Sequence, residues 1–310
     1  MLFQPVEVIF LGTGGTVPTP VRNTVSVALR YNNEVVLFDC CEGCQKQIMM
    51  STVSFMKIKK IFISHYHGDH FLGLPGMLQT MGMLMRTEPL EIYGPEGTES
   101  IVNNILNTGC YELDYNVIPH EIGDGNSVDC GAFIVRAFGL VHPVPTNGYL
   151  FLEKERRGKF LVDKAEKLGI PRRLYGRLQR GESVKYHGML ISPDMVLGPK
   201  RPGISVAYCT DTAPDWNYEH VRNCTLLIHD ATGTEEIRTQ LNEFGHSTAK
   251  QAAEIADKCN AKKLALIHYS QRYKAVTSLL DEAKHIFPAT IAPHDLDTVF
   301  LKYEDVDNPD

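Results

Sequence analysis

A dense cluster of metal-binding side chains occupies positions 65–70, which read His-Tyr-His-Gly-Asp-His. The cluster directly follows an apolar run that favours a buried strand. Alternate residues of an extended chain share a face, so His65 and His67 are placed to reach one metal ion. The turn that follows brings Asp69 and His70 toward a second position. Imidazole and carboxylate donors favour zinc, manganese or iron, whereas the plainer alternative is a set of exposed histidines beside a turn.

Three further donors stand at the ends of other predicted strands. These are His142, Asp211 and His268. Loops at the edge of a sheet gather functional side chains because a rigid scaffold holds them. Each residue alone would fit an ordinary surface or core position, but their shared placement indicates a common metal centre.

Short β-type runs alternate with turns and amphipathic segments along most of the chain. The predicted strands are Val6–Leu11, Thr24–Tyr31, Val35–Asp39, Lys60–Ser64, Ala132–Leu140, Gly148–Leu152, Ser205–Thr210, Leu226–His229 and Lys263–His268. The predicted helices are Gly43–Ser51, Leu72–Met85, Pro95–Asn107, Ser247–Cys259 and Lys274–His285. This alternation favours a layered fold of mixed α/β (α+β) class, and 310 residues are compatible with one such unit. The acidic segment 304–310 is predicted to be a frayed tail.

The composition excludes several classes of protein. The formal net charge of −6 excludes a basic coat over the whole surface, and 43% hydrophobic residues is ordinary for a globular protein. No apolar run reaches the ~18 residues that a membrane span needs, so no membrane association is expected. The N-terminus is typical of a first strand rather than a signal peptide. Eight cysteines without an export signal favour reduced thiols and a cytoplasmic location.

The segment 153–185 differs from the rest in charge. It holds eleven Lys or Arg and five acidic residues, a formal charge of +6 that leaves −12 for the remaining chain. It interrupts two strand-like stretches and offers few candidates for a buried core. We therefore interpret it as an inserted arm; the alternative is a solvated surface face.

These residues, in this order, resemble the metallo-β-lactamase fold and, more narrowly, the ribonuclease Z family. The narrower resemblance rests on short stretches spread over nearly the whole chain. They are Leu11-Gly12-Thr13-Gly14-Gly15 with Arg22-Asn23, Leu37-Phe38-Asp39-Cys40 with Glu42-Gly43, His70-Phe71-Leu72-Gly73-Leu74-Pro75-Gly76, Gly198-Pro199-Lys200-Arg201-Pro202-Gly203, Thr210-Asp211-Thr212, His229-Asp230-Ala231-Thr232, Gly245-His246-Ser247-Thr248 and His268-Tyr269-Ser270-Gln271-Arg272-Tyr273. Cys41 and Cys44 depart from the Gly and Thr that are usual there, and Asp230 from a frequent Glu.

The resemblance implies a four-layer αββα sandwich over residues 1–310, with 153–185 as an inserted basic arm that binds tRNA away from the cut. It also implies two zinc ions per subunit. One ion would be held by three histidines and the other by Asp69 with two histidines, and Asp211 would bridge them. The histidines are His65, His67 and His142 for the first ion, and His70 and His268 for the second. Two ions ~3.5–4 Å apart stabilise an in-line displacement at phosphorus.

The family pattern also assigns catalytic and substrate-binding roles. His246, oriented by Asp230, would protonate the leaving 3′-oxygen, and Asp69 would accept a proton from the attacking water. Arg272 would hold a phosphate oxygen, unless it forms only a surface salt bridge. Asp39 is a plausible partner for the second nitrogen of a ligand imidazole. The arm residues expected to contact RNA are Arg156, Arg157, Arg172, Arg173, Arg177 and Arg180.

The expected function is therefore that of a zinc-dependent tRNA 3′-endonuclease, a metal-dependent phosphodiester hydrolase. It would remove the 3′ trailer of precursor tRNA after the discriminator nucleotide, leaving a 3′-hydroxyl on the tRNA and a 5′-phosphate on the trailer. The family resemblance also implies a homodimer.

Two other functions stay open. A hydrolase of the same fold acting on a small phosphodiester, thioester or lactone would gain nothing from a +6 arm. A metal-bound RNA-binding protein without catalysis would not need the candidate acid. The glycine loop Gly12–Gly15 lacks the spacing of a dinucleotide fingerprint and no GK[ST] follows, so no nucleotide cofactor is expected.

Overall fold

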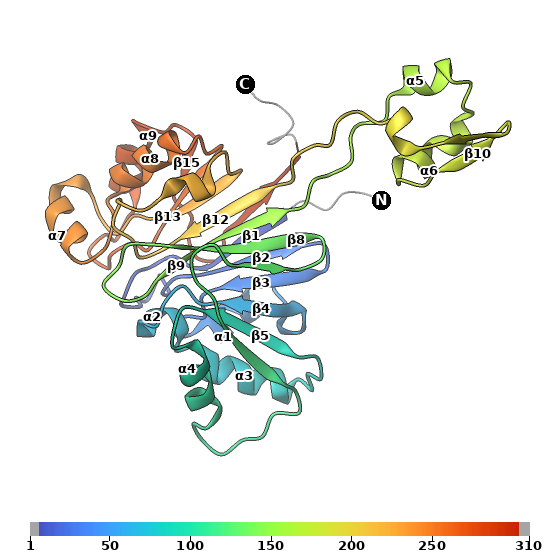
Figure 1. Ribbon diagram of the computed structural model, residues 1–310. Helices are drawn as coiled ribbons and strands as arrows, with labels where there is room; N and C mark the ends of the chain where they lie inside the picture. Colours follow the sequence, from blue (N-terminus) through green and yellow to red (C-terminus); the bar gives the residue numbers. More distant parts are fainter. Residues whose placement is uncertain (1–5, 304–310) are drawn as a thin grey trace. The chain divides into compact units, whose positions relative to one another are not determined.

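The computed structural model describes residues 6–303, so the predicted tail at 304–310 lies outside the described residues. The chain forms two compact units, here called the body and the arm (Figure 1). Within the described residues the body comprises residues 6–152 and 204–303, and the arm comprises 153–203. As a compact unit the arm thus continues beyond the basic stretch 153–185. In residues 6–303, no helix is long and apolar enough to cross a membrane.

The body contains two large mixed sheets. The first has the order β16 (Thr298–Leu301), β1 (Val6–Gly12), β2 (Ser26–Tyr31), β3 (Glu34–Phe38), β4 (Ile58–Phe62), β5 (Leu90–Gly94) and β6 (Val117–Glu121). The second has the order β15 (Thr290–Ile291), β14 (Leu264–Ile267), β13 (Leu226–Asp230), β12 (Ser205–Cys209), β9 (Asn147–Glu153), β8 (Phe133–Gly139) and β7 (Ser127–Asp129). Strands β3 to β6 are parallel to one another, and so are β12 to β15.

The two sheets face each other across an aromatic core. Phe38 of β3 stacks on Tyr149 of β9 and on Tyr208 of β12, with ring centroids 6.0 and 5.3 Å apart. Helices α1 (Cys44–Met50), α3 (Leu74–Met83) and α4 (Thr98–Leu106) pack on the outer face of the first sheet. Helices α8 (Ala249–Lys258) and α9 (Thr277–Lys284) pack on the outer face of the second. The predicted fold class, with helix, sheet, sheet and helix layers, is confirmed.

Each predicted strand and helix overlaps an observed one, but the sequence prediction missed several short elements. The interior strand β5, next to the edge strand β6, was missed because Glu91 interrupts its apolar run between Pro89 and Pro95. The edge strands β6, β7, β15 and β16 are short and largely half-exposed or exposed. The short helices α2 (Gly68–Phe71) and α7 (Arg238–Glu243) also lacked a clear apolar period.

The arm has a small core of its own. It contains α5 (Val162–Lys167), α6 (Tyr175–Gln179) and a hairpin of β10 (Val184–Tyr186) and β11 (Met189–Ile191). Six apolar residues are buried together, namely Ala165, Ile170, Leu178, Val184, Ile191 and Val196. The stretch 153–185, which was expected to offer few core residues, contributes four of these six, and the other two, Ile191 and Val196, follow it.

Candidate active site and metal centre

The candidate functional side chains gather where strands of both sheets reach their carboxyl ends. Asp39 follows β3, the cluster at 65–70 follows β4, and His142 follows β8. Asp211 and His268 follow β12 and β14 in the second sheet. Neighbouring parallel strands end at the same edge of a sheet, so residues far apart in the sequence meet there.

Three of these residues adopt a backbone conformation that is uncommon for residues other than glycine. The φ angles are 57° at Asp39, 52° at Asp211 and 64° at His268. Such left-handed positions cost free energy, of the order of 1 kcal/mol or more, and persist where the surrounding structure enforces them. Each one turns the chain immediately after a buried strand, so the strain is concentrated at the edge where the metal-binding side chains meet.

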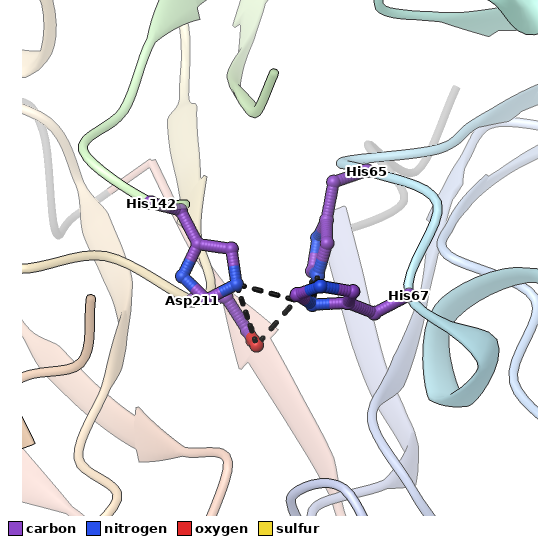
Figure 2. A group of neighbouring side chains, drawn as sticks. All are labelled: His65, His67, His142 and Asp211. Atoms are coloured by element: carbon purple, nitrogen blue, oxygen red, sulfur yellow. Dashed lines mark hydrogen bonds and ion pairs between the residues drawn. The ribbon is translucent and has the colours of Figure 1, made fainter. Parts of the chain in front are cut away.

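One group of four donors consists of His65, His67, His142 and Asp211 (Figure 2). The Nδ1 atom of His67 lies 3.0 Å from Nε2 of His65 and 3.1 Å from Nε2 of His142. Asp211 presents its Oδ2 atom to the same group, 3.8 Å from His65 Nε2 and 3.9 Å from His142 Nε2. Burial lowers the pKa of His65 and of His142, which favours the neutral imidazole that a metal ion requires.

A second group consists of Asp69, His70 and His268. Asp69 Oδ2 lies 3.3 Å from Nε2 of His70 and 3.7 Å from Nε2 of His268. The other carboxylate oxygen of Asp211, Oδ1, lies 3.3 and 3.2 Å from these two nitrogens. Burial opposes the charged form of Asp211, but His268 and His70 hold its pKa well below the usual range. One ionised carboxylate thus faces both groups.

The donor geometry fits two metal ions. Two ligands of a tetrahedral zinc ion, each about 2.0–2.1 Å from it, lie about 3.3 Å apart, and the separations above run from 3.0 to 3.9 Å. Within the described chain, Asp69 Oδ2, His70 Nε2 and His268 Nε2 are buried without a hydrogen-bond partner. Buried polar atoms without partners are costly. A cation that all three atoms contact would remove that cost.

In His70, His142 and His268 the nitrogen that faces away from the metal-binding groups is held by the protein. His70 Nδ1 donates to Asp39 at 2.7 Å, and His142 Nδ1 donates to the carbonyl of Gly245 at 2.9 Å. His268 Nδ1 lies 2.8 Å from the hydroxyl oxygen of Thr232. Such contacts fix the orientation and the tautomer of each ring.

Asp39 was expected in this supporting role, whereas Tyr208 and Thr232 were not predicted. Asp39 also accepts hydrogen bonds from Ser64 and from the hydroxyl of Tyr208, 169 positions away. Thr232 belongs to the quoted His229–Thr232 stretch, which was the available signal, but its contact with His268 depends on the pairing of β13 with β14. Tyr208 lies in an apolar strand and gave no signal beyond its type.

His246 lies beside the metal-binding groups and is held by Asp230. Its Nδ1 atom lies 3.0 Å from Asp230 Oδ2, and Asp230 is fully buried at the end of β13. Burial disfavours a charged imidazole, but the Asp230 carboxylate outweighs it and raises the pKa of His246 to about 9. The ring therefore carries a proton at neutral pH. Because Asp230 holds Nδ1, Nε2 is the nitrogen able to donate it.

These groups open into one cleft of the body, with a volume of about 630 Å³. His67, Asp69, His142, Asp211, His246 and Arg272 line it. Arg272 is exposed there, so its guanidinium is accessible to an anionic substrate. The cleft therefore combines metal donors, a protonated imidazole and a cation.

The arm arginines are surface residues of the other unit. Arg177 and Arg180 both pair with Glu182, at 2.7 and 3.2 Å, and Arg172 lies 3.7 Å from Glu166. The remaining predicted contacts are Arg156, which donates to the Pro202 carbonyl, and the exposed Arg157 and Arg173.

Known proteins similar to this chain point to one family. A β-lactamase superfamily domain model matches residues 194–269, and a model for the anti-Pycsar protein Apyc1 matches residues 6–122. Ribonuclease Z of Archaeoglobus fulgidus is 42% identical and covers 98% of this chain and 100% of its own length. Ribonuclease Z of Pyrococcus horikoshii is 40% identical over 96% of each chain. The chain belongs to the ribonuclease Z family.

Solved structures agree with this membership. Human tRNase Z, short form, superposes with a TM-score of 0.70 at 29% identity and covers 94% of this chain and 98% of its own. The metallo-β-lactamase fold protein YhfI from Bacillus subtilis has a TM-score of 0.68 at 17% identity, covering 96% of this chain and 99% of its own, and shares the fold. The predicted family and metallo-β-lactamase fold are confirmed, and this ribonuclease Z family member is an enzyme.

Proposed function

We propose that this chain is a two-zinc endoribonuclease that removes the 3′ trailer from precursor tRNA. It cuts after the discriminator nucleotide and leaves a 3′-hydroxyl on the tRNA and a 5′-phosphate on the trailer. The observation that carries the proposal is the single cleft in which two donor groups share Asp211 beside the His246–Asp230 pair. The ribonuclease Z relatives, which match along nearly their full length, and the similar structure of human tRNase Z, short form, support tRNA as the substrate.

His65, His67 and His142 would hold one zinc ion, and Asp69, His70 and His268 the other, with Asp211 contacting both. Nitrogen and oxygen donors at these spacings, without thiolate, favour zinc in a catalytic site. When bound, two divalent ions activate water at neutral pH and neutralise the charge of a phosphodiester as it is attacked.

The chain itself supplies the proton for the leaving group. The P–O3′ bond breaks, and a ribose 3′-oxygen is a poor leaving group unless it is protonated. His246 Nε2 donates that proton, while Asp230 accepts from Nδ1 and stabilises the charged ring before transfer. Such general-acid assistance contributes ~10²–10⁴-fold. Asp69, with its pKa well below the usual range, is ionised and able to accept a proton from the attacking water.

Substrate contacts are divided between the body and the arm. Arg272 in the cleft binds a non-bridging phosphate oxygen. The arm arginines bind phosphates of the folded tRNA, which gives affinity without reading sequence. The homodimer stays a prediction from the family resemblance, and the cytoplasmic location stays a prediction from the eight cysteines without an export signal.

The proposal is tested with the zinc-loaded protein and a 3′-extended precursor tRNA labelled at its 5′ end. Cleavage after the discriminator nucleotide, with a 3′-hydroxyl on the labelled product, is the expected result. The His246→Ala variant is the matched control for contaminating nucleases. Hydrolysis of a small phosphodiester without cleavage of the precursor would contradict the tRNA assignment.

A further inference from the structure

Helix α7 ends in a turn that positions several groups of the candidate site. The N–H of Gly245 donates to the carbonyl of Asn242 at 3.1 Å, and the N–H of His246 donates to that of Leu241 at 2.9 Å. With φ of +76° at Gly245, this pair of bonds is a Schellman motif. Glycine is required here, because a Cβ atom would lie 2.7 Å from Nδ1 of His142. The turn therefore fixes the candidate acid and packs against a candidate ligand.

Phe244 is the residue that caps α7 in this turn. Its backbone N–H donates to the carbonyls of Leu241 and Gln240, at 3.1 and 3.3 Å, so its position is set by the helix end. Its side chain lines the cleft and is nevertheless 62% exposed. The neighbouring apolar residues of this wall, Ile237 and Leu241, pack against Gly233 instead. Among the described residues, Phe244 stacks on no other aromatic ring.

A large exposed aromatic ring at the mouth of a catalytic cleft indicates a substrate contact. The ring leaves apolar surface in water, and covering it with a flat apolar partner is favourable. The cleft is built for a phosphodiester, so the partner must belong to a molecule that carries both phosphates and flat rings. A nucleic-acid base meets both conditions, and base stacking on aromatic side chains tolerates any base.

We propose that Phe244 is the stacking platform for the base of the last nucleotide retained on the tRNA. The inference rests on the proposed function. In that reaction His246 protonates the 3′-oxygen of this nucleotide, so its ribose lies at His246. Phe244 stands two residues earlier in the same fixed turn and lines the same cleft. Phe244 is therefore closer to the base of the last retained nucleotide, on the leaving-group side of the scissile phosphate, than to the trailer.

The test pairs substitutions at Phe244 with precursor tRNAs that lack one base. In the zinc-loaded enzyme, Phe244→Leu should raise KM for an intact precursor about tenfold, because stacking of one base is lost. The Phe244→Trp variant keeps a flat ring and should have the KM of the wild type. With a precursor that is abasic at the last retained nucleotide, the KM of the wild type should rise by the same factor. On this precursor Phe244→Leu should raise KM no further. With a precursor that is abasic at the first trailer nucleotide, the tenfold difference in KM between the wild type and Phe244→Leu should be unchanged.

Two controls separate stacking from other roles. Zinc content and melting temperature should be unchanged in Phe244→Leu, and Phe300→Leu, at another exposed phenylalanine (53%), should behave as wild type on every substrate. An equal loss for Phe244→Leu on intact and abasic precursors, or no loss on either, overturns the stacking role. A wild type that hydrolyses a small phosphodiester but leaves precursor tRNA uncut overturns the proposed function as well.

Discussion

The candidate site of the body and the charged surface of the arm are built in opposite ways. Asp211 is 3% exposed and lies 3.2–3.9 Å from four imidazoles. The side chain of Arg172, in contrast, is 86% exposed and pairs with one carboxylate, that of Glu166. The body uses strained backbone and long-range hydrogen bonds to hold its side chains. Catalysis needs a fixed geometry, since small displacements of reacting groups cost large factors in rate. Attraction to phosphates tolerates mobile cations.

This difference predicts two kinds of mutational effect. Changes at the body site should lower turnover of every phosphodiester, whatever its size. Changes in the arm should alter the affinity for tRNA and its dependence on salt, and leave small substrates unaffected. A double readout, with precursor tRNA and bis(p-nitrophenyl) phosphate, therefore separates the two regions in each experiment below.

The largest effect is expected at Asp211. In Asp211→Ala the carboxylate that faces both donor groups is gone, so the zinc content should fall from about two ions per chain and both activities should drop to background. Elemental analysis of the dialysed protein and both assays measure this. The exposed Asp215→Ala on the same loop is the matched control and should keep both. Activity in the Asp211→Ala enzyme, or a content of one zinc ion per chain in the wild type, would contradict the two-metal assignment.

The next largest effect is expected at His246. His246→Ala should lower kcat on precursor tRNA by ~10²–10⁴-fold while zinc content and tRNA affinity stay unchanged. The loss should be smaller on bis(p-nitrophenyl) phosphate, because a nitrophenolate leaves without a proton. His294→Ala, at an exposed histidine with a 74% accessible side chain, is the control. Equal losses on the two substrates would mean that His246 acts in some way other than as the acid.

The site of the body and the arm also differ in how much of each could be predicted from the sequence. The dense cluster at 65–70 and the donors after β8, β12 and β14 were visible because each sits beside an apolar run. The pairing of Asp39 with His70 was not predictable in detail, since it depends on β3 and β4 lying side by side. The turn around Gly245 was also missed, because α7 shows no apolar period. In the arm, charge was obvious from composition, whereas its core was not, because the core residues are spread over 165–196 and two of the six lie beyond the basic stretch 153–185.

Removal of the arm should separate binding from catalysis. The backbones of Arg156 and Arg201 pair with each other, with N–O distances of 2.8 and 2.9 Å, so a short glycine–serine linker can replace residues 157–200 there. The variant should bind precursor tRNA about 10²-fold more weakly at low salt, with a flatter dependence of log affinity on log salt. Hydrolysis of the small diester should persist, because no proposed zinc ligand is removed. Loss of both activities in a zinc-loaded variant would show that the arm takes part in the chemistry.

A smaller effect, in pH dependence, is expected at Asp230. His246 must be protonated to act as the acid, so activity is present below its pKa and falls as the pH rises through it. The Asp230 carboxylate raises that pKa to about 9. In Asp230→Asn the alkaline limb of kcat should therefore move to lower pH, by about one unit or more. The diester reaction should show no such shift, and an unmoved limb for tRNA would contradict the pairing.

The smallest effect has the opposite sign and lies in the arm. Glu182 pairs with both Arg177 and Arg180, so Glu182→Gln frees two guanidinium groups without removing a cation. Affinity for precursor tRNA should rise about two- to threefold at low salt, and the salt dependence should steepen by about one phosphate contact. The exposed pairs are worth little to stability, so the melting temperature should barely change.

The matched control for this gain is Glu219→Gln in the body. Glu219 also pairs with an arginine, Arg222, and both side chains are more than half exposed. The substitution raises the net charge by the same amount but away from the arm, on a body whose formal charge is negative. If attraction to RNA is concentrated in the arm, Glu219→Gln should leave affinity unchanged. Equal gains from the two variants would instead mean that net charge alone sets the affinity, and that the arm is no special surface.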